Sequence, residues 1–326
     1  MRAQLPRGPV MLGIEGTALA EADVARLSHP LVGGVILFTR NFIDTAQLTA
    51  LTEAIRALRT PHLVIAVDHE GGRVQRFRDG FTCPRPMRTL GELWDRDVAA
   101  AQREAAKVGW TIASELRSHG VDLSFTPVLD LDYGASTIIG DRALHRNPNA
   151  VAHLASALRR GLAAGGMAAC GKHFPGHGCI AADSHSELPV DNRSLEDITI
   201  DDLVPFAALV HEGLEAVMAA HVVYPAVDSA PAGYSRIWCT TILRERLGFD
   251  GLIFSDDLGM AGAHAAGDIV ARAHAVIAAG CDIALTCNEM DAADDLLARW
   301  KPPTQPELAR RWARIEGRAG GERPSL

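Results

Sequence analysis

The stretch Leu63-Val-Ile-Ala-Val-Asp68 decides the fold of this 326-residue chain. Its unbroken apolar run is typical of a short strand that is buried on both faces, as in a parallel sheet covered by helices. A carboxylate follows the run at once. Further apolar runs of strand length occur along the chain, and together they predict a sheet of eight strands. The eight runs are Val10–Ile14, Gly34–Phe38, Leu63–Val67, Val121–Phe125, Met167–Gly171, Ala216–Ala220, Gly251–Phe254 and Cys281–Leu285.

Helical patterns alternate with the predicted strands. Thr45–Leu58 has Leu48, Leu51 and Ile55 at three- and four-residue spacing, which puts them on one face of a helix. Strand and helix alternate throughout, which predicts the α/β class and a single (β/α)8 barrel of the TIM type rather than two domains. The other helical patterns cover Val98–Arg117, Ala150–Ala164, Asp201–Glu212 and Asp268–Ala279.

The C-terminal segment differs in composition from the rest of the chain. We expect residues 1–326 to form one barrel domain, with a tail from about residue 300 that is rich in Pro, Arg and Gly. Within this tail, Glu307–Glu316 is predicted to be helical, and the end is predicted to fray.

Composition narrows the class of function. The formal net charge is −8 and no basic block occurs, so nucleic acid is not an expected partner. The N-terminus has no basic region followed by an apolar core, and no apolar run approaches the roughly 20 residues of a membrane span. The six cysteines form no CxxC pair and are expected to be free thiols. We therefore expect a cytoplasmic protein, monomeric and without membrane contact, that acts on a small polar molecule.

Polar residues collect where the predicted strands end. The carboxyl ends of barrel strands carry the active sites of such folds. Carboxylates, His and Lys at one ring of positions favour a ligand with many hydroxyl groups, such as a sugar. These strand-end residues are Glu15, Thr39, Arg40, Asp68, Glu70, Asp130, Asp132, Lys172, His173, His221, Asp256, Asp257 and Asn288.

The segment Lys172-His-Phe-Pro-Gly-His-Gly178 is unusually rich in ionisable groups, and its Gly and Pro residues predict a loop. Asp183-Ser-His185 follows closely. An Asp two residues before a His can orient the imidazole for proton transfer, whereas a lone loop His is more often simply solvated. His173, His177 and His185 are also conceivable metal ligands. No HExxH motif or Cys cluster supports zinc, so no metal and no cofactor are expected.

Phe254-Ser-Asp-Asp-Leu258 places two carboxylates directly after a predicted strand. Adjacent strand residues face opposite sides, so Asp256 and Asp257 are expected to differ in role. One of them can be a nucleophile or general base, and the alternative is a cap for the next helix. A serine hydrolase is a weaker hypothesis, because the chain has no G-x-S-x-G motif.

Asp68-His-Glu-Gly-Gly-Arg-Val-Gln-Arg76 suggests a sugar-binding loop. Asp68 can accept hydrogen bonds from vicinal hydroxyls, and Arg76 can donate to substrate oxygens. The structural alternative is a buried Asp–Arg pair that holds the loop, for which Arg73 is the best candidate. Arg142, in Gly140-Asp-Arg142, offers another guanidinium; its alternative is a surface turn.

These motifs, together with Leu37-Phe-Thr-Arg-Asn41, resemble glycoside hydrolase family 3. Within it, the chain looks like the single-domain bacterial β-N-acetylhexosaminidases of cell-wall recycling. The resemblance covers about Val10 to Asn288, with several long motifs in the family's order. It implies that Asp256 is the catalytic nucleophile, that His185 is the general acid/base and that Asp183 is its dyad partner. The substrate-binding residues it implies are Asp68, Arg76, Arg142, Lys172 and His173.

The chain departs from the family pattern at two points. His69 stands where relatives often carry Gln, and we expect it to tune the pocket rather than to remove chemistry. We expect no second α/β domain of the kind that supplies the acid/base residue in many family members. The loop that bears His185 is expected to replace it, swinging in when substrate binds. His177 is left with a structural role as the default.

The resemblance implies a retaining exo-β-N-acetylhexosaminidase that removes terminal N-acetylglucosamine from anhydro-muropeptides of peptidoglycan recycling, and so serves the cell wall, cell shape and division. Retention requires a covalent glycosyl–Asp256 intermediate and a proton donor on the other side of the anomeric carbon. Three alternatives remain open: a phosphorylase or β-glucosidase on the same scaffold, a non-catalytic sugar-binding barrel, and a metal-dependent hydrolase.

Overall fold

The centre of the molecule is a sheet of eight parallel strands in the order β8-β5-β3-β2-β14-β13-β10-β9. The computed structural model describes residues 3–180 and 188–321. All eight predicted runs contribute a strand. These strands are β2 (Val10–Gly13), β3 (Val32–Leu37), β5 (Val64–Val67), β8 (Leu123–Ser124), β9 (Cys170–Phe174), β10 (Ala216–Ala219), β13 (Leu252–Asp257) and β14 (Ile283–Thr286).

The two edge strands of this sheet meet and close it into a barrel. Isolated parallel bridges join Leu123 to Ala168 and Val128 to Lys172. The seam is reinforced where the Leu129 amide donates to the Lys172 carbonyl at 2.6 Å. The predicted single (β/α)8 barrel is therefore confirmed.

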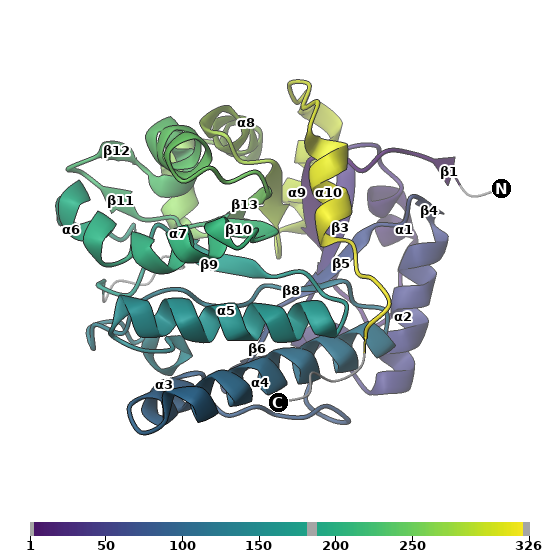
Figure 1. Ribbon diagram of the computed structural model, residues 1–326. Coiled ribbons are helices and arrows are strands. Elements are labelled where there is room, and N and C mark those ends of the chain that lie inside the picture. The colour runs from purple at the N-terminus through teal and green to yellow at the C-terminus, as the bar shows by residue number, and fades with distance from the viewer. Residues whose placement is uncertain (1–2, 181–187, 322–326) are drawn as a thin grey trace.

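Helices pack around the barrel and follow the strands in turn (Figure 1). The five helices predicted from periodicity are all present. Helix α2 begins after Asp44, whose side chain accepts from the Gln47 amide at 2.8 Å, and it buries Leu48, Leu51 and Ile55 against the sheet. The helices are α1 (Glu21–Leu27), α2 (Thr45–Ala57), α3 (Arg88–Trp94), α4 (Val98–Ser118), α5 (Pro148–Ala164), α6 (Leu195–Ile200), α7 (Leu203–His211), α8 (Ile269–Ala279), α9 (Met290–Arg299) and α10 (Leu308–Ile315), with a wider helical segment at Ile237–Arg246.

Short elements decorate the ends of the barrel. Two hairpins, β6–β7 and β11–β12, lie at the carboxyl ends of the strands, and β1 pairs with β4. The short strands are β1 (Ala3–Gln4), β4 (Arg59–Thr60), β6 (His69–Gly71), β7 (Val74–Gln75), β11 (Val223–Tyr224) and β12 (Asp228–Pro231). Short 3-10 helices cover Thr39–Asn41, Gly140–Arg142, Ala232–Tyr234 and Ala261–Ala266.

One local prediction is wrong. The segment from Lys172 was predicted to be a loop, but β9 runs on through Phe174, which pairs with Ala219 of β10. This buried strand can contain two polar side chains because carboxylates of neighbouring elements pair with them: Asp68 accepts from Lys172, and Asp130 contacts the His173 ring. The loop begins only after Phe174.

The predicted C-terminal helix is part of the core rather than a loose tail. Helix α10 lies at the amino ends of the strands, where Trp312 is fully buried and its indole N–H donates to the Gly8 carbonyl at 3.1 Å. The indole meets the ring of Phe254 edge-on at 6.2 Å between centroids. A Cβ on Gly33 would approach the indole to 2.6 Å, so this glycine makes room for it. Helix α10 therefore plugs the end of the barrel opposite the carboxyl ends of the strands.

We expect Trp312→Ala to lower the free energy of unfolding by about 3 kcal/mol, because it empties a fully buried volume and orphans the Gly8 carbonyl. Urea unfolding measures this loss directly. The exposed Val98→Ala serves as the control and should change stability by less than about 0.5 kcal/mol. An equally small loss for Trp312→Ala would mean that α10 does not stabilise the barrel.

Candidate active site

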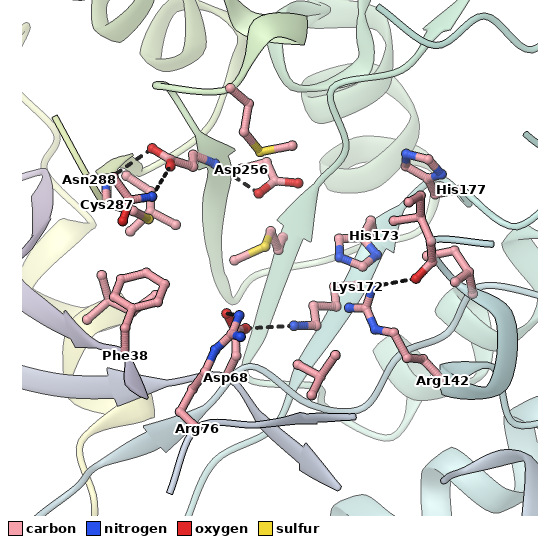
Figure 2. A pocket seen from close by; sticks show the side chains of 18 of the residues that line it. Phe38, Asp68, Arg76, Arg142, Lys172, His173, His177, Asp256, Cys287 and Asn288 are labelled. Carbon is pink, nitrogen blue, oxygen red and sulfur yellow. Dashed lines mark hydrogen bonds and ion pairs between the residues drawn. The ribbon is translucent and has the colours of Figure 1, made fainter. Parts of the chain in front are cut away.

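A cavity of about 380 Å³ opens at the carboxyl ends of the barrel strands. Its size suits a small ligand. Apolar and charged side chains share its wall, and Figure 2 shows Asp256 across the cavity from Asp68 and Arg76. The lining residues are Ile36, Phe38, Asp68, Arg73, Val74, Arg76, Ile138, Ile139, Arg142, Lys172, His173, His177, Met218, Asp256, Asp257, Met260, Leu285, Cys287 and Asn288.

Asp68, directly after β5, forms one charged wall of the cavity together with two cations. Its carboxylate accepts from Lys172 Nζ at 2.9 Å and from Arg76 Nη2 at 3.2 Å. Burial opposes ionisation of Asp68, but Lys172 and Arg76 together hold its pKa well below the usual range. The ionised carboxylate keeps lone pairs for a ligand and can accept hydrogen bonds from its hydroxyl groups.

Glu70, in β6, lies behind this wall and is 1% exposed. Both of its oxygens accept from the Arg142 guanidinium, Oε2 from Nε and Oε1 from Nη2, each at 2.8 Å. Lys172 Nζ lies 2.6 Å from Oε1. Burial opposes ionisation of Glu70, but Arg142 and Lys172 lower its pKa to about 2. For Lys172, the loss of solvation is outweighed by Asp68 and Glu70, which raise its pKa.

Asp130 organises the adjoining wall from a fully buried position. Its Oδ2 lies 2.7 Å from His173 Nδ1, and its Oδ1 accepts from the His173 and His177 amides at 3.2 and 2.7 Å. Burial opposes ionisation of Asp130, but His173 lowers its pKa to about 2. Asp130 therefore fixes the His173 ring and the backbone of the segment that follows β9.

His177 lines the cavity and is 3% exposed, and neither of its ring nitrogens has a hydrogen-bond partner among the described residues. Its ring lies 6.2 Å from that of His173, and burial lowers its pKa. A neutral imidazole is therefore favoured at this position.

Asp256 and Asp257 end β13 and differ in environment, as predicted from strand alternation. Asp257 Oδ1 accepts from the amides of Gly259 and Cys287 at 3.0 and 3.1 Å, which ties β13 to the end of β14. Burial raises the pKa of Asp257. Asp256 accepts from the Asp257 amide at 2.9 Å and presents its carboxylate to the cavity, without an ion pair to any described residue.

Six of the predicted site residues come together in this cavity. Asp183 and His185 lie outside the described residues, so their positions are not part of this geometry. The six that line the cavity are Asp68, Arg76, Arg142, Lys172, His173 and Asp256.

Some details differ from what the residue patterns suggested. The surface-turn alternative for Arg142 is wrong, because this side chain forms the ion pair with Glu70. Arg73 is not buried with Asp68; its side chain is 47% exposed and lies 3.4 Å from Asp141. His69 was expected to tune the pocket but packs behind the wall against Phe81, with ring centroids 5.5 Å apart.

Sequence patterns did not single out several contributors. Glu70 and Asp130 were noted only as polar residues at strand ends. The sequence signal that could have marked them is a carboxylate close to one strand end, together with cationic residues at the ends of other strands. Apolar lining such as Phe38 and Met218 carries no signal apart from its place next to a strand end.

Within residues 3–180 and 188–321, no group of three or more His, Cys, Asp or Glu side chains is arranged to hold a metal ion. The six cysteines are free thiols. Among the described helices, none is both long and apolar enough to span a bilayer.

Asp130 predicts a specific acid sensitivity. The ordinary pKa of an Asp side chain is 3.8, and the folded protein lowers the pKa of Asp130 to about 2, so folding favours the carboxylate form. This stabilisation is present above about pH 4 and is lost as the pH falls towards 2, by about 2 kcal/mol in total. Urea unfolding of the protein and of Asp130→Asn across this range measures the effect. The variant should be less stable at neutral pH and should lose less stability on acidification; parallel curves would contradict the prediction.

Comparisons with known proteins identify the family of the chain. Residues 8–315 match the model of the glycosyl hydrolase family 3 N-terminal domain. The chain is 61% identical over 318 residues to a β-hexosaminidase of Chromobacterium violaceum, covering 98% of this chain and 89% of that protein. A β-hexosaminidase of Bordetella avium is 60% identical over 309 residues, with 94% and 88% covered.

Solved structures give the same picture. NagZ from Neisseria gonorrhoeae superimposes with a TM-score of 0.94 at 54% identity, covering 98% of this chain and 92% of that one. The same protein in complex with N-trifluoroacetyl-D-glucosamine matches with a TM-score of 0.94 at 53% identity, with 98% and 93% covered. Fold and sequence thus agree with these proteins over nearly the whole chain.

Proposed function

This chain belongs to glycoside hydrolase family 3, and from that premise we propose that it removes terminal β-linked N-acetylglucosamine from peptidoglycan-derived muropeptides. It is a β-hexosaminidase, as its relatives at about 60% identity are. The choice of sugar is supported by the NagZ structure that contains N-trifluoroacetyl-D-glucosamine.

The observation that carries the proposal is the position of Asp256 in the cavity. Its carboxylate faces the cavity without an ion pair to any described residue, while Asp68, Lys172 and Arg76 form a polar wall on the other side. A sugar held by that wall would present its anomeric carbon to Asp256. Attack by the carboxylate forms a glycosyl–Asp256 ester as the bond to the leaving oxygen breaks, and water then releases the sugar with retained configuration.

The leaving oxygen needs a proton, and we assign its transfer to His185, oriented by Asp183. Asp68 and Glu70 are ion-paired carboxylates with lowered pKa values, so at neutral pH they have no proton to give. Asp257 adjoins the nucleophile on the same strand, whereas the donor is required on the opposite side of the anomeric carbon. None of these three described carboxyl groups suits the role, which favours an imidazole as the acid/base, because an imidazole ordinarily titrates near neutrality.

Substrate binding is assigned to the charged walls of the cavity. Lys172 and Arg142 present donors, Asp68 presents acceptors, and His173 is held in one orientation by Asp130. Such mixed donors and acceptors match vicinal hydroxyl groups. Because all these side chains come from one barrel, we propose that a single domain carries out the whole reaction. We also propose that it acts as a monomer in the cytoplasm.

A phosphorylase is the second candidate, because an imidazole acid/base does not repel phosphate and the cavity already contains Arg76 and Arg142. A survey of aryl β-glycosides with and without phosphate tests both functions. We expect N-acetylglucosaminides to be cleaved faster than glucosides, with free sugar as the product at every phosphate concentration. A sugar 1-phosphate product would establish the phosphorylase, and sugar binding without turnover would establish a binding barrel. Loss of activity on chelation would establish a metal-dependent hydrolase.

A further inference from the structure

We propose that Glu70 is a positioning residue: this buried carboxylate holds Lys172 and Arg142 in the orientation in which they bind one hydroxyl group of the sugar. The inference rests on the proposed function, since it deepens the account of that site. Glu70 is absent from the lining of the cavity and, being 1% exposed, would act on the ligand only through these two cations.

Glu70 is the common partner of two cations from distant parts of the chain. Arg142 lies 72 residues away in sequence, and its Nε and Nη2 each donate to a Glu70 carboxylate oxygen at 2.8 Å. Lys172, in β9, lies 2.6 Å from the oxygen that also accepts from Arg142 Nη2. A planar two-point grip fixes the plane of the guanidinium, and the shared oxygen fixes the ammonium beside it.

The other contacts of these cations do not replace Glu70. Lys172 also bonds Asp68, but Asp68 is shared with Arg76. Arg142 also donates to the Ile138 carbonyl at 3.2 Å, a single contact to a backbone oxygen. Without Glu70, Arg142 would keep no carboxylate partner among the described residues, and Lys172 would keep only Asp68, which it shares with Arg76.

The charge of Glu70 matters as much as its shape. The groups that face Lys172 are Asp68, Glu70, Arg142 and the thiol of Cys170, which burial keeps protonated. Glutamine at position 70 would keep the volume but replace one acceptor by an N–H₂ donor that points at another donor. Lys172 and Arg142 are then expected to separate, and an ångström-scale displacement can cost about 100-fold in rate.

The test is a cycle of enzyme variants and deoxy substrates. Wild type and Glu70→Gln are assayed on an aryl β-N-acetylglucosaminide and on its 3-, 4- and 6-deoxy analogues. For wild type, loss of the hydroxyl read by this pair should lower kcat/KM by about 100-fold or more. For Glu70→Gln, kcat/KM for the parent substrate should be about 100-fold lower than for wild type. Removing the same hydroxyl from the substrate should then lower kcat/KM by less than about 10-fold further, because the variant has already lost the interaction with that hydroxyl.

Glu215→Gln is the matched control. Glu215 also grips an arginine at two points, Arg159 at 3.2 and 2.6 Å, but it lies directly before β10, at the opposite end of the barrel. It should lower the melting temperature without changing discrimination among the deoxy substrates. If Glu70→Gln fails to fold, Glu70→Asp keeps the charge with a shorter reach and should give an intermediate loss of discrimination.

The outcomes separate this proposal from the proposed function. Equal losses for parent and deoxy substrates in Glu70→Gln would make Glu70 purely structural, and a wild type that tolerates every deoxy analogue would also overturn the proposal. If wild type does not cleave the glycoside at all, the proposed function fails. Calorimetric binding of N-acetylglucosamine and its deoxy forms then still tests Glu70 without turnover.

Discussion

Asp256→Ala is expected to lower kcat/KM by about 10⁴-fold or more, because removing the proposed nucleophile would leave only binding and electrostatic contributions. The folded structure should persist, since within residues 3–180 and 188–321 the Asp256 side chain accepts only from the neighbouring Asp257 amide. Steady-state assays on an activated aryl N-acetylglucosaminide, together with thermal unfolding, measure both quantities.

Two further readouts identify the role of Asp256. A fluorinated N-acetylglucosaminyl inactivator should label Asp256 in the wild type, as peptide mass spectrometry would show. In Asp256→Ala, azide should restore turnover by entering the space of the lost carboxylate and should give the α-glycosyl azide. Asp257→Asn is the matched control, because its amide oxygen can still accept from Gly259 and Cys287, so most activity should remain. Labelling of another residue would sink the assignment.

The barrel could be predicted because its strands are short and are buried on both faces. Val64–Val67 is fully buried, and a run without polar interruptions is what such a strand requires. The prediction failed at β9, where Lys172 and His173 interrupt the pattern. Their burial depends on Asp68 and Asp130, which lie far from them in sequence. The hydrophobic pattern of a short segment cannot predict such distant partners.

The sequence predicted which strand ends contribute to the site, but it did not predict how their side chains pair. Asp68, Lys172 and Asp256 stand next to strand ends, and the barrel fold brings those ends together. The division of labour among the carboxylates was not predictable, because Glu70 and Asp130 differ from Asp68 and Asp256 only in what surrounds them. A similar limit applies to α10, whose helical pattern is visible while its position under the barrel depends on Trp312 meeting Gly33 and Gly8.

His185→Ala is expected to lower kcat/KM by about 10³-fold for substrates with a sugar leaving group, in the middle of the range for general acid catalysis. The same variant should lose less than about 10-fold on an aryl glycoside whose phenol leaves as an anion, since that oxygen needs no proton. A series of aryl leaving groups of rising pKa measures the effect as a steeper dependence of rate on leaving-group pKa. The exposed His211→Ala, at the end of α7, should leave this dependence unchanged.

The leaving-group series also separates His185 from Asp256, because loss of the nucleophile should slow every substrate in the series. A uniform loss for His185→Ala would therefore assign it to binding or folding and return the acid role to another residue. Asp183→Asn should follow the pattern of His185→Ala with a smaller loss, because in the proposed mechanism Asp183 orients the imidazole and stabilises its cation, and the variant leaves the proton donor in place. If Asp183→Asn slowed activated and natural substrates equally, the two residues would not act as a pair.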